Sequence, residues 1–375
     1  MSLVRAGARD VWTAAYDLDR GTLPSLARTI AQEIAAALRV GVRSGAPAPE
    51  HQTNYRAYDA YQRGRVLWEQ RDPASLERSV EFFKQAASLD PAYAQAWAGL
   101  ADAYIAMGVP AFGSLTPLET RRLAKESALK AIELDPNLVE AHTSLAFTAF
   151  LHDWNWPVAE RRFQQAIELN PQYPLAHHWY AEFLNEMGRF DEALAEIRRA
   201  QDLDPMSVLI HRDIAWHYFC QRRYEEAVTQ LRGTLSLDPR FTPARTLLAR
   251  VLSAKGLHAE ALAELEESRR NISEATYLSF KGHMQAAAGD ATSALATIAE
   301  LRRLGDRTYV TPYYLALIYS ALGRNAEALV ELERSHAEQD STLVTVYIDP
   351  RFDPIRHEPR FKALLRRMEF PARHP

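Results

Sequence analysis

The chain reads AHHWYAEFLNEMGRFDEALAEIRRAQDLDP at residues 176–205. Apolar residues recur at helical spacing on both sides of the turn MGRFDEA (187–193), and Gly188 stands where a helix would end in a left-handed residue. Ala181 and Ala193 lie on opposite sides of that turn. Two antiparallel helices approach closely only where both carry small side chains, so this stretch predicts a tightly packed helical hairpin.

The same unit recurs along the chain. Prolines that end Leu-Asp-Pro or Leu-Asn-Pro triplets stand at positions 91, 136, 171, 205 and 239, and the later intervals are about 34 residues. Small residues pair as in the first stretch at Gly64 with Ser79, Ala101 with Ala124, Ala146 with Ala159, Ala215 with Ala227, Ala249 with Ala261, Gly282 with Ala294 and Ala316 with Ala328. The pattern predicts about eight helix–turn–helix units stacked into a solenoid.

Over residues 55–338 this pattern resembles the tetratricopeptide repeat (TPR), most closely at 176–205 and in ARTLLARVLSAKGLHAEALAELEES (244–268). The resemblance implies an all-α TPR superhelical solenoid. In that fold the first helix of each pair lines the concave surface and the second lies outside. It also implies a non-catalytic scaffold that binds a protein or peptide in its groove.

The first fifty residues do not repeat. DVWTAAYDL (10–18) is typical of a strand, and LPSLARTIAQEIAAALRV (23–40) is typical of an amphipathic helix. Residues 11–40 are similar to the end of the TolB-like α/β domain that precedes TPR arrays in bacterial regulators. We therefore interpret residues 1–40 as a remnant of such a domain or a capping helix. The resemblance implies a signalling protein, and three alternatives for an upstream domain stay open: a class III adenylate or guanylate cyclase, a protein kinase, or a winged-helix DNA-binding domain.

Two further segments flank the repeats. Residues 41–54 have the composition of a linker. Residues 339–375 are expected to cap the solenoid, because a last helix would place Phe361, Leu364, Leu365 and Met368 on one face. Within the array, the insertion 105–123 contains Thr116-Pro117-Leu118-Glu119, which predicts a helix start with a capping box.

Candidate groove residues follow from the repeat. Counting each repeat from three residues after its proline, positions 5, 9 and 12 of the first helix point inward. They supply the predicted binding groove: Phe147, Phe150, His178, Glu182, Asn185, Arg212, Trp216, Phe219, Arg250 and Ser253. Aromatic rings beside Arg, His and Asn are typical of a site for an extended peptide. Phe147, Phe150 and Trp216 fit packing between adjacent helices equally well, and the charged members fit solvated walls.

The adjacent histidines of AHHWYAEF have different roles in this frame. His177 shares position 4 with His142 and His211, which indicates packing between neighbouring helices. His178 and Glu182 share one inward face, but a metal ion would need a third ligand there. We therefore interpret the two residues as a hydrogen-bonding pair and expect no metal and no cofactor.

Composition excludes several classes of function. A net charge of −4 and a pI near 6.3 give no electrostatic reason to expect direct nucleic-acid binding. The single cysteine, Cys220, excludes a disulfide within the chain and a cysteine-based zinc site. No apolar run reaches the length of a membrane span, and the chain reads as cytoplasmic. His211-Arg212-Asp213 matches the start of a kinase catalytic loop, but Tyr218 stands where the metal-binding Asn is required. The expected partner is a protein or peptide, an upstream domain of the same protein, or a second copy in a homodimer.

Overall fold

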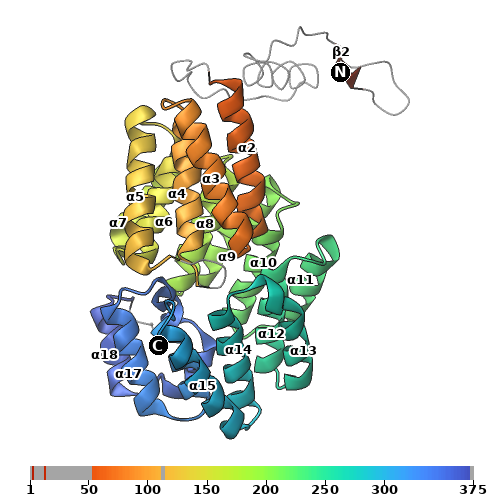
Figure 1. Cartoon of the computed structure of the whole chain (residues 1–375), viewed down its shortest axis with the longest axis vertical. Helices are drawn as coiled ribbons and strands as arrows, with labels where there is room; N and C mark the ends of the chain where they lie inside the picture. The colour runs from red at the N-terminus through yellow and green to blue at the C-terminus, as the bar shows by residue number, and fades with distance from the viewer. Residues whose placement is uncertain (1, 4–11, 14–52, 111–114, 372–375) are drawn as a thin grey trace.

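The computed structural model of the chain describes residues 2–3, 12–13, 53–110 and 115–371 (Figure 1). Eight helical hairpins follow one another along the described part of the chain. They are α2 (Tyr55–Gln70) with α3 (Pro73–Leu89), α4 (Ala94–Met107) with α5 (Pro117–Leu134), α6 (Val139–Leu151) with α7 (Trp156–Leu169), α8 (Pro174–Glu186) with α9 (Phe190–Leu203), α10 (Val208–Cys220) with α11 (Tyr224–Leu237), α12 (Thr242–Ala254) with α13 (His258–Ser268), α14 (Glu274–Ala287) with α15 (Ala291–Gly305), and α16 (Pro312–Ala321) with α17 (Asn325–Ala337). The predicted all-α solenoid of about eight repeats is confirmed.

Two short strands stand before the helices. β1 (Ser2–Leu3) pairs antiparallel with β2 (Trp12–Thr13). The strand predicted at 10–18 overlaps β2, whereas the helix predicted at 23–40 lies outside the described residues.

Small residues set the distance between the helices of each hairpin. The paired alanines predicted from the sequence are fully buried, among them Ala181, Ala193, Ala249 and Ala261. At Gly282 an added Cβ would stand 2.6 Å from Cδ1 of Ile318, so a larger side chain has no room there. Gly188 and Gly256 close their helices with φ of +76° and +80°, as predicted from the turns.

A recurring hydrogen bond ties each first helix to the loop before it. A side chain at position 4 bonds the carbonyl oxygen of the proline six residues earlier. The five pairs are Trp97 with Pro91 (3.3 Å), His142 with Pro136 (2.8 Å), His177 with Pro171 (3.2 Å), His211 with Pro205 (2.9 Å) and Arg245 with Pro239 (2.9 Å). The histidines at position 4 therefore satisfy a loop carbonyl at the start of the helix, a role that the packing interpretation did not include.

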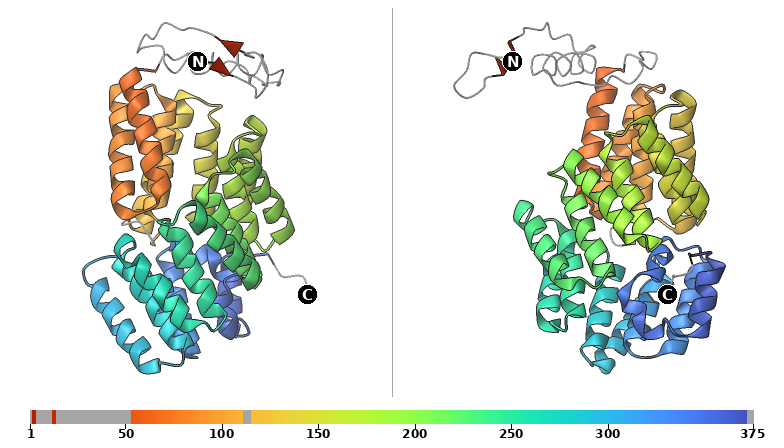
Figure 2. Two further views of the ribbon diagram at one scale, coloured as in Figure 1. Left: turned by 90° about the vertical axis from the view of Figure 1, so that its right-hand side faces the viewer. Right: turned by 180° about the vertical axis from the view of Figure 1, so that it is seen from behind.

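The segment after the last hairpin turns back against earlier repeats. It contains η2 (Ser341–Tyr347), η3 (Pro350–Ile355) and α18 (Pro359–Arg367), and η2 contacts both α6 and α8. Nε1 of Trp156 donates to the carbonyl oxygen of Met368 at 2.8 Å, and Phe370 stacks between Trp156 and Tyr347. In Figure 2 the blue C-terminal helices accordingly lie beside the yellow and green helices of the third and fourth repeats.

The insertion after α4 makes a second long-range contact. The carbonyl oxygen of Pro110 accepts hydrogen bonds from Ser273 Oγ (3.0 Å) and Thr276 Oγ1 (2.9 Å) of the seventh repeat. Ser341 Oγ donates to the carbonyl oxygen of Gly108 at 3.2 Å. Together with the C-terminal segment, these contacts close the superhelix on itself and enclose its concave side.

The predicted capping box is present, and most of the apolar face predicted for the last helix is buried. Thr116 and Glu119 form the capping box of α5, and Phe361 and Leu364 of α18 are fully buried. Among the described residues, no helix is both long enough and apolar enough to cross a bilayer.

Candidate binding pocket

A cavity of about 250 Å³ lies at the centre of the closed superhelix. Its walls come from the first helices of seven repeats (α4, α6, α8, α10, α12, α14 and α16) and from η2 and η3. Because the C-terminal segment crosses the concave face, the interior takes the form of a partly open pocket instead of a long groove.

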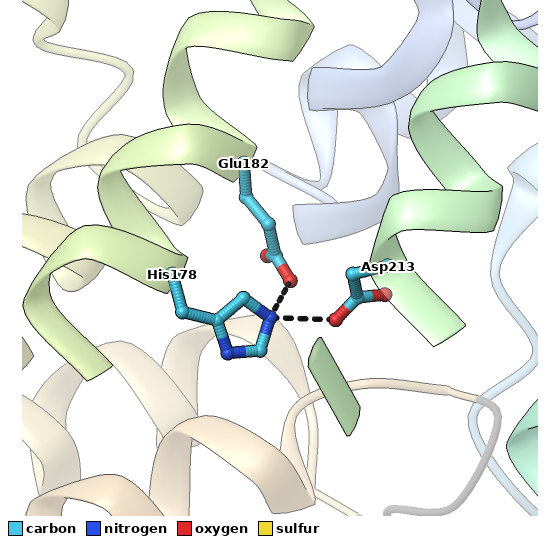
Figure 3. Close-up of side chains that lie close together, drawn as sticks. All are labelled: His178, Glu182 and Asp213. Atoms are coloured by element: carbon cyan, nitrogen blue, oxygen red, sulfur yellow. Dashed lines mark hydrogen bonds and ion pairs between the residues drawn. The ribbon is translucent and has the colours of Figure 1, made fainter. Parts of the chain in front are cut away.

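One histidine and two carboxylate side chains meet on one wall of this pocket (Figure 3). His178 and Glu182 project from α8, and Asp213 faces them from α10. Nε2 of His178 lies 2.7 Å from Oδ2 of Asp213 and 3.4 Å from Oε1 of Glu182. The predicted His178–Glu182 pair is therefore present, but Asp213 is the closer partner of the imidazole. Arg212 binds the other oxygen of Asp213.

The protonation of this cluster follows from its surroundings. Burial opposes a charge on His178, but the hydrogen bonds from its ring to Asp213 and Glu182 outweigh burial and raise its pKa to about 9. Burial also acts against the charge of Asp213, yet Arg212 and His178 hold the pKa of that carboxyl well below its usual range. Burial, with the charge of Asp213 added to it, raises the pKa of Glu182. At neutral pH the pair is therefore an imidazolium bound to the Asp213 carboxylate.

The same three residues have the donor set of a metal site. Their ligand atoms all lie within 4.8 Å of one another, and one nitrogen with two carboxylate oxygens suits zinc or another divalent ion. Here the positive charges of His178 and Arg212 already neutralise Asp213. A metal ion would have to displace the imidazole proton, so the geometry favours a charge network.

Arginines and aromatic rings form the rest of the lining. The guanidinium of Arg250 lies over the rings of Trp216 (4.7 Å) and Phe280 (5.4 Å). Arg351, from η3, pairs with Asp349 at 2.6 Å. Phe147 stacks on Trp179 with ring centres 4.3 Å apart. The pocket thus combines several guanidinium groups with flat apolar walls.

Most of the predicted groove residues reach this pocket. Those at positions 5 and 9 of the repeats, and Phe150 at position 12, line it: Phe147, Phe150, His178, Glu182, Arg212, Trp216 and Arg250. The other three, Asn185, Phe219 and Ser253, all stand at position 12. They are buried and do not line the cavity, because the end of the first helix packs against its neighbours there.

Several pocket residues have no counterpart in the predicted set. Asp213 directly follows Arg212, which stands at inward position 5 of its repeat. His178 stands at position 5 of the repeat before, so Asp213 lies one repeat and one residue after its partner His178. A search for opposite charges at adjacent positions of successive repeats would have found the pair. Arg71 ends α2, and Arg351 lies beyond the last hairpin, so no repeat position marks either of them.

Comparison with known proteins agrees with this architecture. Models of the tetratricopeptide repeat family match residues 155–212 and residues 212–276. The chain is a tetratricopeptide repeat protein. Proteins built from this repeat act as scaffolds for protein interactions, and that general class of function holds for this TPR array.

Individual relatives are more distant. The transcriptional regulator HilA of Salmonella typhimurium is 29% identical over 137 residues, which cover 36% of this chain and 24% of HilA. The match thus spans about a quarter of the length of that relative. The structure titled "Human IFIT1 dimer with PPP-AAAA" has a TM-score of 0.58 at 16% identity, over 91% of this chain and 76% of that one. A Thermus thermophilus TPR protein has a TM-score of 0.43 at 18% identity, over 52% and 98% of the two chains. The likeness to the IFIT1 structure shows a shared fold over the aligned part of the chain.

Proposed function

We propose that this TPR array is the sensory, non-catalytic region of a bacterial signalling protein and that its central pocket binds an effector. The observation that carries the proposal is the cavity of about 250 Å³ whose walls come from seven repeats and the C-terminal segment. A ligand there would contact elements far apart in the sequence, so its binding would stabilise the closed form of the whole superhelix.

The enclosure also bears on the kind of ligand. The sequence predicted an extended peptide along the concave groove, but η2 and the loop at Pro110 now occupy part of that surface. The remaining volume suits a small molecule or the end of a partner segment. Outer helices and turns remain as surfaces for a protein partner or an upstream domain.

HilA is named as a transcriptional regulator, and this supports one of the alternatives for the whole protein. Among a cyclase, a kinase and a winged-helix regulator, it favours the regulator. In that case the TPR array would sense the effector, and another part of the protein would read DNA.

The test is a screen of a few hundred neutral, cationic and anionic fragments against the chain, with the melting temperature as readout. At least one fragment is expected to raise the melting temperature of the wild type. Leu209→Trp, which places a larger side chain on the partly buried cavity wall, should abolish that shift while the protein stays folded by circular dichroism. If no fragment of any charge binds, or if binding is unchanged in Leu209→Trp, the pocket is not an effector site.

A further inference from the structure

Two arginines that line the central cavity have no acceptor among the described residues. Within the described part of the chain, Arg250 makes no hydrogen bond and no ion pair, and its buried Nε lacks a partner. Arg71 is 8% exposed, its guanidinium lies over the ring of Trp68 at 3.7 Å, and its buried Nε has no hydrogen-bond partner among the described residues. Buried charges in proteins are normally paired, because leaving one unpaired is costly. We propose that the cavity binds a small organic anion with a flat apolar body, and that Arg250 is the principal contact of its acidic group.

This inference rests on the proposed effector function and names the class of effector. The surroundings of Arg250 show why an anion is the missing partner. Burial, and after it the nearby charge of Arg351, lower the pKa of Arg250 to about 9, with Asp349 acting in the opposite direction. The faces of Trp216 and Phe280 offset only part of this cost. An anionic group in the cavity would supply the missing counter-charge.

Two more arginines are fixed near Arg250 and retain free donors. Arg351 uses Nε and one terminal nitrogen to bind Asp349, and no described residue is a hydrogen-bond partner of its buried Nη1. Arg212 uses Nη1 to bind Asp213, and its Nε has no partner in the part of the chain that the structure describes. Both side chains are held by these carboxylates, so little conformational entropy remains to be lost when a ligand binds. Arginines from α10, α12 and η3 thus converge on one cavity.

The carboxylates around the cavity do not cancel this positive character. Asp213 and Asp349 are each bound to an arginine, and Asp213 also to His178. Glu186 accepts a hydrogen bond from Trp216 at 3.0 Å, and burial raises the pKa of its carboxyl well above the usual range, which disfavours a negative charge on it. Glu182 faces the imidazolium of His178. Arg250 and Arg71 therefore carry the unbalanced charge of the lining.

The walls and the size define the body of the ligand. The aromatic rings of Trp216, Phe280 and the stacked pair of Phe147 and Trp179 line the cavity. Its volume of about 250 Å³ exceeds the roughly 150 Å³ that suffices to bind benzene in an engineered protein. It lies just below the roughly 300 Å³ at which pockets for drug-sized ligands begin. A single aromatic or similarly flat group with one acidic substituent fits these limits.

The experiment compares matched probes on the full chain by isothermal titration calorimetry. Benzoate and phenyl phosphate carry the acidic group on the same ring, benzamide is the neutral counterpart of benzoate, and inorganic phosphate lacks the ring. We expect at least one aromatic anion to bind at least tenfold more tightly than benzamide and inorganic phosphate. The stronger of the two aromatic anions then identifies the acidic group as a carboxylate or a phosphate.

The variants locate the contact. Arg250→Met keeps the aliphatic stem on Trp216 and removes the charge, and it should weaken binding of the aromatic anion about ten- to hundredfold. Arg71→Met should weaken it less. Arg240→Met, on an exposed loop, makes the same chemical change outside the cavity and should leave affinity unchanged. The melting temperature of Arg250→Met without ligand should be no lower than that of the wild type, which shows that the variant folds.

Two results would overturn the inference. The first is that neither benzoate nor phenyl phosphate binds more tightly than benzamide. The second is that the affinity for the aromatic anion is unchanged in Arg250→Met. If neutral fragments still bind in a manner sensitive to Leu209→Trp, the effector pocket stands and only its anionic class is wrong. If no fragment binds at all, both proposals fail.

Discussion

The imidazolium of His178 should make the stability of the protein depend on pH in a defined direction. Its pKa is about 9 in the folded protein, against about 6.5 in an unfolded chain. Below pH 6.5 both states bind the proton, and the folded state gains the full benefit of the tighter binding. That benefit declines as the pH rises from 6.5 and is lost above pH 9. At about 1.4 kcal/mol for each pKa unit, it amounts to about 3 kcal/mol.

The perturbation that tests this is His178→Gln, which retains a hydrogen-bond donor for Asp213 but cannot take up a proton. The difference in unfolding free energy between wild type and variant should be largest at pH 6 and should shrink by about 3 kcal/mol by pH 9.5. Urea titrations followed by circular dichroism at several pH values measure it, provided that the slopes of the two proteins agree.

A double-mutant cycle provides the control. In an Asp213→Asn background the imidazole has lost its closest carboxylate, so the effect of His178→Gln should depend much less on pH. A wild-type minus variant difference that stays constant from pH 6 to 9.5 would refute the reasoning, because it would mean that the site holds no additional proton.

Three further predictions concern packing and buried charge. Gly282→Ala should lower the free energy of unfolding by about 1–3 kcal/mol, because its Cβ would stand 2.6 Å from Ile318. Gly233→Ala, whose Cβ would have no atom within 4 Å, should raise the free energy of unfolding by about 0.5–1 kcal/mol. Urea midpoints measure both changes. Phe370→Ala should lower the free energy of unfolding by about 3 kcal/mol, because it removes the ring between Trp156 and Tyr347. The C-terminal segment should then detach more easily, and faster hydrogen exchange of the η2 amides would detect this. Burial lowers the pKa of His217 to about 3, so between pH 6.5 and pH 3 the unfolded chain binds a proton at this site that the folded protein does not, and the wild type loses stability as the pH falls. His217→Leu should therefore resist acid better than the wild type, by about 2 kcal/mol at pH 5, which urea titrations at pH 5 and pH 7 measure.

The local architecture was readable from the sequence because it repeats. Spacing of small residues, such as Ala181 with Ala193, fixes where two helices touch, and each copy of the repeat tests the assignment again. The capping box at Thr116 and the left-handed Gly188 rest on short-range rules that need no tertiary context. Inward positions 5 and 9 then followed from helical geometry alone.

The closure of the superhelix was not readable in this way. It depends on contacts between segments far apart in the chain, such as Trp156 with Met368 and Ser273 with Pro110. The small rotation between successive repeats accumulates over eight hairpins, so sequence rules for one repeat do not determine where the last one arrives. For the same reason, Arg71 and Arg351 were not predicted to face one cavity with Arg250.

Closure also changes what a single binding event can do. In an open solenoid each repeat contacts only its neighbours, and a ligand on one repeat acts locally. Here the same cavity contacts α8, α10, α12 and the C-terminal η3. Asp213 on α10 and Asp349, which follows the last hairpin, each hold one of its arginines. A ligand that binds the closed arrangement more tightly than an open one must shift the equilibrium between them by that difference in affinity. The unpaired charge of Arg250 disfavours the ligand-free closed form, so an anion in the cavity would favour closure in proportion to the charge that it neutralises.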